Sequence, residues 1–218
     1  MFHNEKWQPV VAKLTWSHFL IVMPLKNENE IMFYLTNAIE KRQSKRELQE
    51  SIKLKEYYRL PESTRNKLIT NTKLELKDTI KDPIIINADK NIINEKALQL
   101  VILEDISSFL KELGNGFTFV DNEYRIKIGD RYNYIDLLLF NYIYNCFVVV
   151  ELKVTEYKKE YAGQIKAYMT YCDNYLKSIN NNPTLGIVLV RKNNRFYVEY
   201  TSNENIIAWE YILFKRDI

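Results

Sequence analysis

The sequence of 218 residues is poor in the residues that several common enzyme chemistries require. Its five glycines include no pair in a phosphate-cradling loop, so Walker and dinucleotide-binding fingerprints are absent. The two histidines, His3 and His18, lie far upstream of the richest motif region, which argues against zinc hydrolases and histidine-dependent nucleases. The two cysteines, Cys146 and Cys172, exclude a disulfide framework and a cysteine-rich zinc site. Catalysis would therefore rest on carboxylate, lysine, tyrosine or hydroxyl groups.

Long apolar runs are also missing. The longest run near the start, Phe19–Met23, is too short to span a bilayer and lacks a signal-peptide cleavage pattern. A hydrophobic fraction of 46% with 27% charged residues is typical of a folded globular protein rather than a disordered chain. We therefore expect a cytoplasmic protein without a membrane partner.

The two halves of the chain differ in their patterns. The first half is helical: Asn27–Glu40 carries apolar residues at helical spacing, and Ser44 with Glu47 forms a capping box that opens a second helix toward Tyr58. Asp82-Pro83 indicates a boundary. We predict a helical recognition or assembly domain at residues 1–84 and a second domain at residues 85–218.

Basic residues are concentrated before this boundary. Residues 41–82 contain 12 Lys or Arg against seven Asp or Glu, although the whole chain has a net charge of only +3. This excess fits either a solvated helical face or a nucleic-acid footprint.

The second half reads as a helix, three strands, a helix and two strands. We expect one long helix from near Asn94 to Gly114 and another at about Lys159–Leu176. The expected strands are Tyr124–Ile128, Tyr134–Phe140, Cys146–Val154, Thr184–Val190 and Arg195–Thr201. The apolar stretch Ile206–Leu213 remains unassigned.

Three charged residues interrupt the apolar strands. Asp136 lies inside one strand, while Glu151 and Lys153 end the next and share a face by period-two alternation. If the turn is centred near Ile143, paired positions sum to about 286, which places Asp136 beside Val150 and Glu151 at one end of a hairpin. Burying carboxylates is costly unless they are paired or bind a cation.

This set suits metal-assisted phosphodiester hydrolysis. Asp136, Glu151 and the Leu152 carbonyl can hold Mg²⁺, and Lys153 can orient a water molecule or stabilise developing negative charge. The competing interpretation is a structural ion pair between strands. In the helix that follows, Gln164 is polar on a face of aromatic residues. Extending the inward stripe of the helix before the strands reaches Gln99 and Glu95, and first-turn stabilisation by the helix dipole also explains Glu95.

The motifs around these residues resemble the PD-(D/E)XK nuclease domain of the YhcG family. The resemblance covers nearly the whole chain, including an upstream part that is similar to the helical domain accompanying that nuclease. The segments that carry it are Tyr134–Leu138, Val150–Lys153, Glu160–Gln164, Asn182–Ile187, Val198–Tyr200 and, upstream, Leu14–His18, Phe33-Tyr34 and Arg46–Leu48.

The resemblance implies an α/β, restriction-endonuclease-like mixed sheet between helices, with Mg²⁺, or alternatively Mn²⁺, at Asp136 and Glu151. It implies a catalytic Lys153 supported by Gln164, and we expect substrate contacts from the same helix. The superfamily often has a helix Glu where this chain has a Gln, so a third carboxylate would have to come from one turn earlier. The residues expected to contact substrate are Tyr168 and Lys166, and the expected helix site is Gln99 with Glu95.

The resemblance further implies a metal-dependent endonuclease acting on DNA. The helical domain would recognise substrate or a partner, or join copies of the chain into a homo-oligomer. It begins close to its Trp-Ser-His segment, so an upstream helix of the family would be absent here. The alternative is a nucleic-acid-binding or assembly module whose nuclease fold does not cut.

Overall fold

The structure, a computed structural model, describes residues 13–70, 72–88, 92, 94–192 and 205–214. The chain divides into two compact units, Met1–Leu74 and Glu75–Ile218, about ten residues before the boundary expected at Asp82-Pro83. The segment between the two positions contributes α7 (Leu76–Thr79) and β1 (Ile84–Asn87). Because β1 pairs with a strand near the end of the chain, this segment belongs with the sheet.

The N-terminal unit is helical, as expected. The helix predicted from Asn27 is confirmed, since the Asn27 side chain accepts hydrogen bonds from two backbone amides of the first turn. The capping box of Ser44 and Glu47 is confirmed as well. Apolar side chains of these helices, including the buried Tyr34 and Leu48, form a separate core. The described helices are α2 (Trp16–Val22), α3 (Glu28–Glu40), α4 (Lys45–Lys53), α5 (Glu56–Arg59) and α6 (Glu62–Ile69).

The predicted continuation of the second helix toward Tyr58 is wrong. The helix ends at Lys53, and Lys55 adopts the left-handed conformation with φ +52°. A residue in the left-handed conformation cannot continue a right-handed helix, so a new helix, α5, begins at Glu56.

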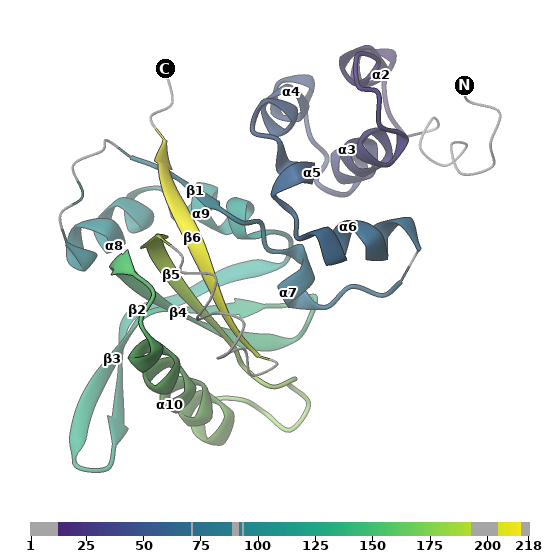
Figure 1. The fold of residues 1–218 in the computed structure, drawn as a ribbon. Coiled ribbons are helices and arrows are strands. Elements are labelled where there is room, and N and C mark those ends of the chain that lie inside the picture. Colours follow the sequence, from purple (N-terminus) through teal and green to yellow (C-terminus); the bar gives the residue numbers. More distant parts are fainter. Residues whose placement is uncertain (1–12, 71, 89–91, 93, 193–204, 215–218) are drawn as a thin grey trace. The chain divides into compact units, whose positions relative to one another are not determined.

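The second unit is built on a six-stranded mixed sheet (Figure 1). The strand order is β1-β6-β5-β4-β3-β2, with parallel pairing from β1 to β4 and antiparallel pairing from β4 to β2. This arrangement confirms the expected α/β class. The remaining elements are α8 (Glu95–Glu104), α9 (Ile106–Leu113), β2 (Phe117–Ile128), β3 (Arg131–Asn141), β4 (Cys146–Glu156), α10 (Lys159–Tyr175), β5 (Leu185–Lys192) and β6 (Ile206–Phe214).

Several strands differ from the sequence prediction. β2 begins seven residues earlier than expected, at Phe117, and the short β1 was not expected. The unassigned apolar stretch is β6. The strand expected at Arg195–Thr201 lies outside the described residues.

The single long helix expected before the strands is also wrong. It breaks at Asp105, whose backbone (φ −131°, ψ 54°) is not helical, into α8 and α9. The Asp105 side chain accepts a hydrogen bond from the Ser108 amide and so caps the second helix. The break resets the helical phase. A single helix would turn Leu103, Ile106, Leu110 and Leu113 inward, but of these only Leu113 is buried, and the other buried apolar positions are Leu98, Ile102 and Phe109.

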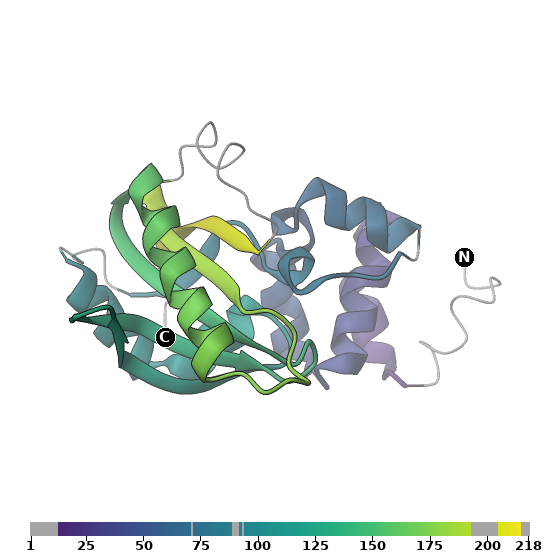
Figure 2. The ribbon, with the colours of Figure 1, turned by 90° about the horizontal axis from the view of Figure 1, so that it is seen from below.

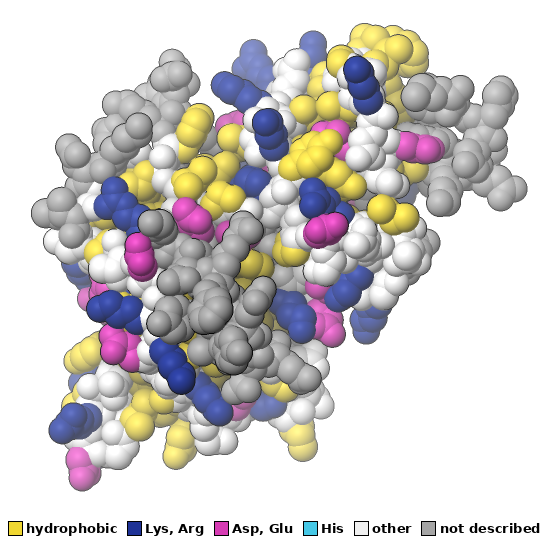
Figure 3. Space-filling model, viewed as in Figure 1, with side chains coloured by type: hydrophobic (Ala, Val, Ile, Leu, Met, Phe, Trp, Pro, Cys, Tyr) yellow, Lys and Arg dark blue, Asp and Glu magenta, His cyan; other side chains and the backbone are white. Residues whose placement is uncertain are grey.

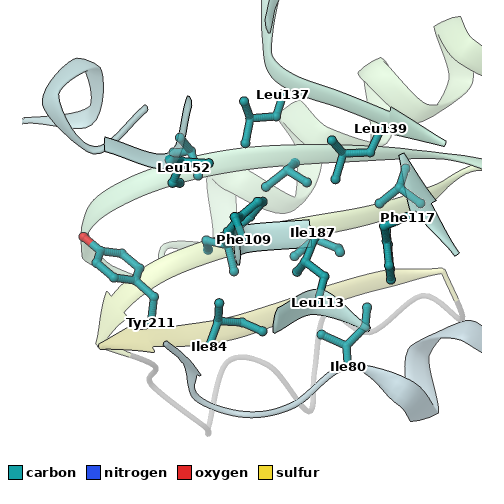
Figure 4. Close-up of a cluster of buried hydrophobic side chains, with 14 of the residues drawn as sticks. Ile80, Ile84, Phe109, Leu113, Phe117, Leu137, Leu139, Leu152, Ile187 and Tyr211 are labelled. Carbon is teal, nitrogen blue, oxygen red and sulfur yellow. The ribbon is translucent and has the colours of Figure 1, made fainter. Parts of the chain in front are cut away.

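Helices cover the sheet on both faces. On one face, α8 and α9 pack on alternate residues of the central strands, such as Leu137, Val150 and Leu152 (Figure 4). On the other face, α10 lies over the strands (Figure 2). It packs on the intervening strand residues, such as Val149 and Val188. β4 therefore lies in the interior of the sheet with both faces covered, as its continuous apolar sequence predicts.

The pairing of β3 changes along its length. β3 pairs with β4 only as far as Leu137 opposite Val150, whereas β3 and β2 stay paired to Ile128 opposite Arg131. The paired positions of β3 and β4 sum to 287, one more than the sequence estimate. The outer part of the β2–β3 hairpin therefore extends past β4, and Asp136 lies where the two strands separate.

Candidate active site

The centre of the candidate site is a buried ion pair on β4. Glu151 and Lys153 lie on the α10-facing side, and Lys153 Nζ is 2.8 Å from Glu151 Oε1. α10 contributes Gln164, whose Nε2 donates to Glu151 Oε1 at 2.7 Å and to the Tyr168 hydroxyl at 2.9 Å. The sequence prediction that these residues converge is therefore met by their geometry.

Asp136 joins the cluster from the strand junction. Its Oδ2 accepts a hydrogen bond from the Leu152 amide at 2.7 Å, which takes the place of the interrupted ladder between β3 and β4. The amide and carbonyl of one strand residue point toward the same neighbouring strand. The Leu152 carbonyl is therefore directed to the Asp136 side of β4, where it could contribute to the cation site predicted from the sequence.

Gln99 holds the backbone of Asp136 in place. It is 3% exposed, and its Nε2 donates to the Asp136 carbonyl at 2.8 Å. Its Oε1 accepts from Lys96 Nζ, which also lies 2.6 Å from Glu123 Oε1. A carboxylate at position 99 could not donate this bond, so Gln99 acts here as a positioning residue. The sequence analysis missed Lys96 and Glu123, since only the pairing of β2 with β3 brings Glu123 to this place.

Two predicted residues lie at or beyond the edge of the cluster. Glu95, in the first turn of α8, is exposed and has Oε1 3.5 Å from Lys153 Nζ. Lys166 is exposed on α10 and does not lie at the cluster. It is two residues after Gln164, which places it roughly 200° away around the helix axis. Tyr161, whose ring centroid lies 5.2 Å from Lys153 Nζ, adds a cation–π contact that the prediction did not include.

Burial and crowding of like charges raise the proton affinity of the carboxylates. Burial, with the neighbouring charge of Asp136, raises the pKa of Glu151 to about 7. Burial also raises the pKa of Asp136, although the Leu152 amide and Lys153 oppose this. Burial alone would lower the pKa of Lys153, but the hydrogen bond and charge of Glu151, with Glu95 and Asp136, raise it overall. The site carries an excess of negative charge that a cation would relieve.

The donor set fits a hard divalent cation. Glu151 Oε2 is buried and has no hydrogen-bond partner among the described residues, an arrangement that is costly unless another ligand satisfies the oxygen. Carboxylate and carbonyl oxygens suit Mg²⁺, which keeps several waters and needs only one or two carboxylates. In the described part of the chain, no group of three or more His, Cys, Asp or Glu side chains could hold a metal. Such a cation would therefore rely on Asp136, Glu151, backbone oxygen and water.

Comparison with known families agrees with this geometry. The model of the YhcG PDDEXK nuclease domain matches residues 77–216, which include every element of the sheet. The chain belongs to the YhcG nuclease family. The DUF1016 N-terminal domain matches residues 1–59, so the recognised resemblance is confirmed for both parts.

Individual proteins similar to this chain extend the comparison. The chain is 27% identical over 194 residues to the YhcG protein of Escherichia coli (strain K12), covering 84% of this chain and 52% of that protein. The chain thus spans about half the length of the curated relative it matches. Among solved structures, a repair endonuclease from Pyrococcus abyssi aligns with a TM-score of 0.41 at 19% identity, over 59% of this chain and 50% of its own. A complex of EndoMS with double-stranded DNA gives 0.37 at 17% identity, over 59% and 48%.

The restriction-endonuclease-like class expected for this YhcG-family chain is confirmed. It rests on the family match together with the mixed sheet between helices and the N-terminal helices. Within the described residues, no helix is both long and apolar enough to cross a membrane.

Proposed function

We propose that the chain is a Mg²⁺-dependent endonuclease that hydrolyses phosphodiester bonds of DNA. The observation that carries this proposal is the buried Oε2 of Glu151, which no described residue satisfies, in a cluster with Asp136 and Lys153. Mn²⁺ would suit the same oxygen ligands.

Asp136 and Glu151 would hold the cation, together with the carbonyl of Leu152, the residue that directly follows Glu151. The hydrogen bond from the Leu152 amide fixes the Asp136 carboxylate, and the amide of Gln164 fixes Glu151. When bound, Mg²⁺ supplies charge neutralisation for the phosphate and lowers the pKa of a water molecule. Both carboxylates are oriented before any substrate arrives, which limits reorganisation during the reaction.

Lys153 would act on the reacting phosphate. Its ammonium group is held by Glu151, by the more distant Glu95 and by the ring of Tyr161. A fixed positive charge in a largely buried site stabilises negative charge that develops on the phosphate oxygens in the transition state. Tyr168, whose hydroxyl accepts from Gln164, lies within reach of the same substrate.

The N-terminal domain would bind substrate or a protein partner, including a second copy of the chain. Residues 41–74 contain ten Lys or Arg and four Asp or Glu, so the basic excess lies within this unit. Phosphate contacts from such a surface strengthen DNA binding without reading sequence.

A panel of duplex, branched and single-stranded DNA substrates, incubated with Mg²⁺ or with EDTA, tests the proposal. We expect at least one substrate to be cut with Mg²⁺ and none with EDTA. Binding without cleavage of any substrate would contradict the proposal and favour the non-cleaving binding module.

A further inference from the structure

The outer part of the β2–β3 hairpin, residues 124–135, exposes tyrosines beside basic residues on one face. Arg125 is paired with Tyr134, and Lys127 is paired with Tyr132. Directly opposed residues of antiparallel strands share a face, so these four side chains form one array, which we call the hairpin platform. Tyr132 is 59% exposed and Tyr134 is 53% exposed. Figure 3 shows Lys or Arg side chains next to yellow side chains, a colour that includes tyrosine, on this projecting hairpin, with an acidic side chain at its tip.

The opposite face of the same hairpin is already used. Ile126 and Ile135 are fully buried in the core cluster of α10, with Tyr124 packed against it. The hairpin is therefore held in place by one face. The platform is not a core face that has lost its covering, because alternation assigns the core contacts to the other residues.

The charges of the platform suit a polyanion. Among the described residues, no carboxylate lies within ion-pair distance of Arg125, Lys127 or the neighbouring Arg131. The Arg125 guanidinium lies 5.0 Å from the centroid of the Tyr132 ring, which orients both groups before a ligand binds. Positive charge interleaved with exposed aromatic rings is how proteins hold single strands, through phosphate contacts and base stacking.

The spacing of the two rings favours unpaired bases. Tyr132 and Tyr134 are two residues apart on a strand, so their Cα atoms are about 6.7 Å apart. Neighbouring bases in a duplex rise by only ~3.4 Å along each strand, so two duplex bases could not stack on both rings. A splayed single strand can. Tyr134 is also only two residues before Asp136 on β3, about 6.7 Å along the strand, so the platform begins close to the candidate active site.

We propose that the hairpin platform stacks unpaired DNA bases next to the scissile bond, with Arg125 and Lys127 on the adjoining phosphates. This proposal rests on the proposed nuclease function, because it names the form of DNA that enters the site. It assigns the substrate class as DNA with a single-stranded segment.

Fluorescence of 2-aminopurine in a thymidine oligonucleotide tests the platform directly. Binding is measured with the full chain in EDTA, so no strand is cut, and with a duplex of the same length as comparison. We expect the unsubstituted protein to quench 2-aminopurine by stacking. Tyr132→Leu with Tyr134→Leu should remove the quenching and weaken single-strand binding about tenfold or more, with duplex binding changed less than threefold.

Matched variants separate stacking from other effects. Tyr134→Phe keeps an aromatic ring and should bind like the parent. Tyr142→Leu removes a tyrosine of similar exposure, 64%, in the turn at the far end of β3, and should change nothing. Both platform tyrosines are exposed, so circular dichroism should show intact folding of the leucine variants.

Three results would overturn the platform: no quenching by the unsubstituted protein, unchanged single-strand binding in the double leucine variant, or equal losses for duplex and single strand. Cleavage with Mg²⁺ separates this proposal from the proposed function. If the protein quenches 2-aminopurine but cuts no substrate, the platform proposal stands and the nuclease proposal is wrong. If the protein cuts DNA but the double leucine variant binds single strands like the parent, the nuclease proposal stands and the platform proposal is wrong.

Discussion

The replacement Glu151→Gln should remove cleavage and, without metal, stabilise the nuclease domain at alkaline pH. The side chain keeps its shape and an acceptor for Lys153 and Gln164, but it can no longer ionise. Burial and Asp136 raise the pKa of Glu151 to about 7 from its ordinary 4.5. A difference of about 2.5 pKa units corresponds to roughly 3 kcal/mol against the ionised, folded form. The variant should be more stable by about this amount at pH 8.

The stabilisation should depend on pH in one direction. Because the folded-state pKa is raised, ionisation of Glu151 progressively destabilises the folded protein as the pH rises from 4.5 to 7. At pH 4.5 the parent is largely protonated when folded, so the difference from Glu151→Gln should shrink to below about 0.5 kcal/mol. Above pH 7 the difference should level off.

Urea unfolding in EDTA measures this difference. Trp209 is the single tryptophan of residues 75–218, so replacing Trp7 and Trp16 by Phe leaves a reporter for the nuclease domain alone. Glu104→Gln, an exposed change at the end of α8, is the matched control and should leave stability and cleavage unchanged. Equal stability of Glu151→Gln and the parent at pH 8 would refute the reasoning, as would a gain that is as large at pH 4.5 as at pH 8.

Four further predictions concern the metal, the lysine, the helix residue and the N-terminal domain. Mg²⁺ affinity should weaken about tenfold per pH unit below pH 7, because protons compete for Glu151; calorimetry showing no change between pH 6 and 7 would contradict this. Lys153→Ala should lose turnover yet keep near-normal Mg²⁺ affinity. Lys153→Arg should not restore cleavage, because a planar guanidinium cannot take the place of a compact ammonium. Loss of Mg²⁺ binding by Lys153→Ala in calorimetry would instead indicate a structural ion pair. Gln99→Leu should lower the free energy of unfolding by about 1–3 kcal/mol and slow cleavage, because the Asp136 carbonyl loses its hydrogen-bond donor. An unaltered urea midpoint and an unaltered cleavage rate would argue against a positioning role for Gln99. A fragment of residues 75–218 should cut DNA weakly and should bind duplex DNA with a weaker salt dependence than the full chain. If the N-terminal domain makes three or four phosphate contacts, the slope of log affinity against log salt should be flatter by roughly three. Equal slopes for the fragment and the full chain would show that the N-terminal domain does not contact DNA phosphates.

The parts of the site that lie on regular strands could be predicted from the sequence. Alternation places Glu151 and Lys153 on one face of β4, and a short turn fixes the hairpin register to within one residue. Helical spacing likewise places Gln164 and Tyr168 on the sheet-facing side of α10.

The parts that depend on irregular backbone could not be predicted. The break at Asp105 leaves no clear signal, because its apolar flanks continue at plausible helical spacing. β1 is only four residues long, and its place beside β6 is a long-range choice that local patterns do not contain. The sequence places Gln99 where the superfamily often has a helix Glu, but only the structure shows its amide donating to the Asp136 backbone.

The cleavage rate of Asp136→Asn with Mg²⁺, compared with the parent and with Glu104→Gln purified in the same way, tests the central claim most directly. The substitution keeps an acceptor for the Leu152 amide but removes a charge that the cation needs. The account predicts that the parent and Glu104→Gln cut DNA at equal rates and that Asp136→Asn is slower by about 10² or more. Cleavage by Asp136→Asn at the parental rate would show that this cluster is not the active site.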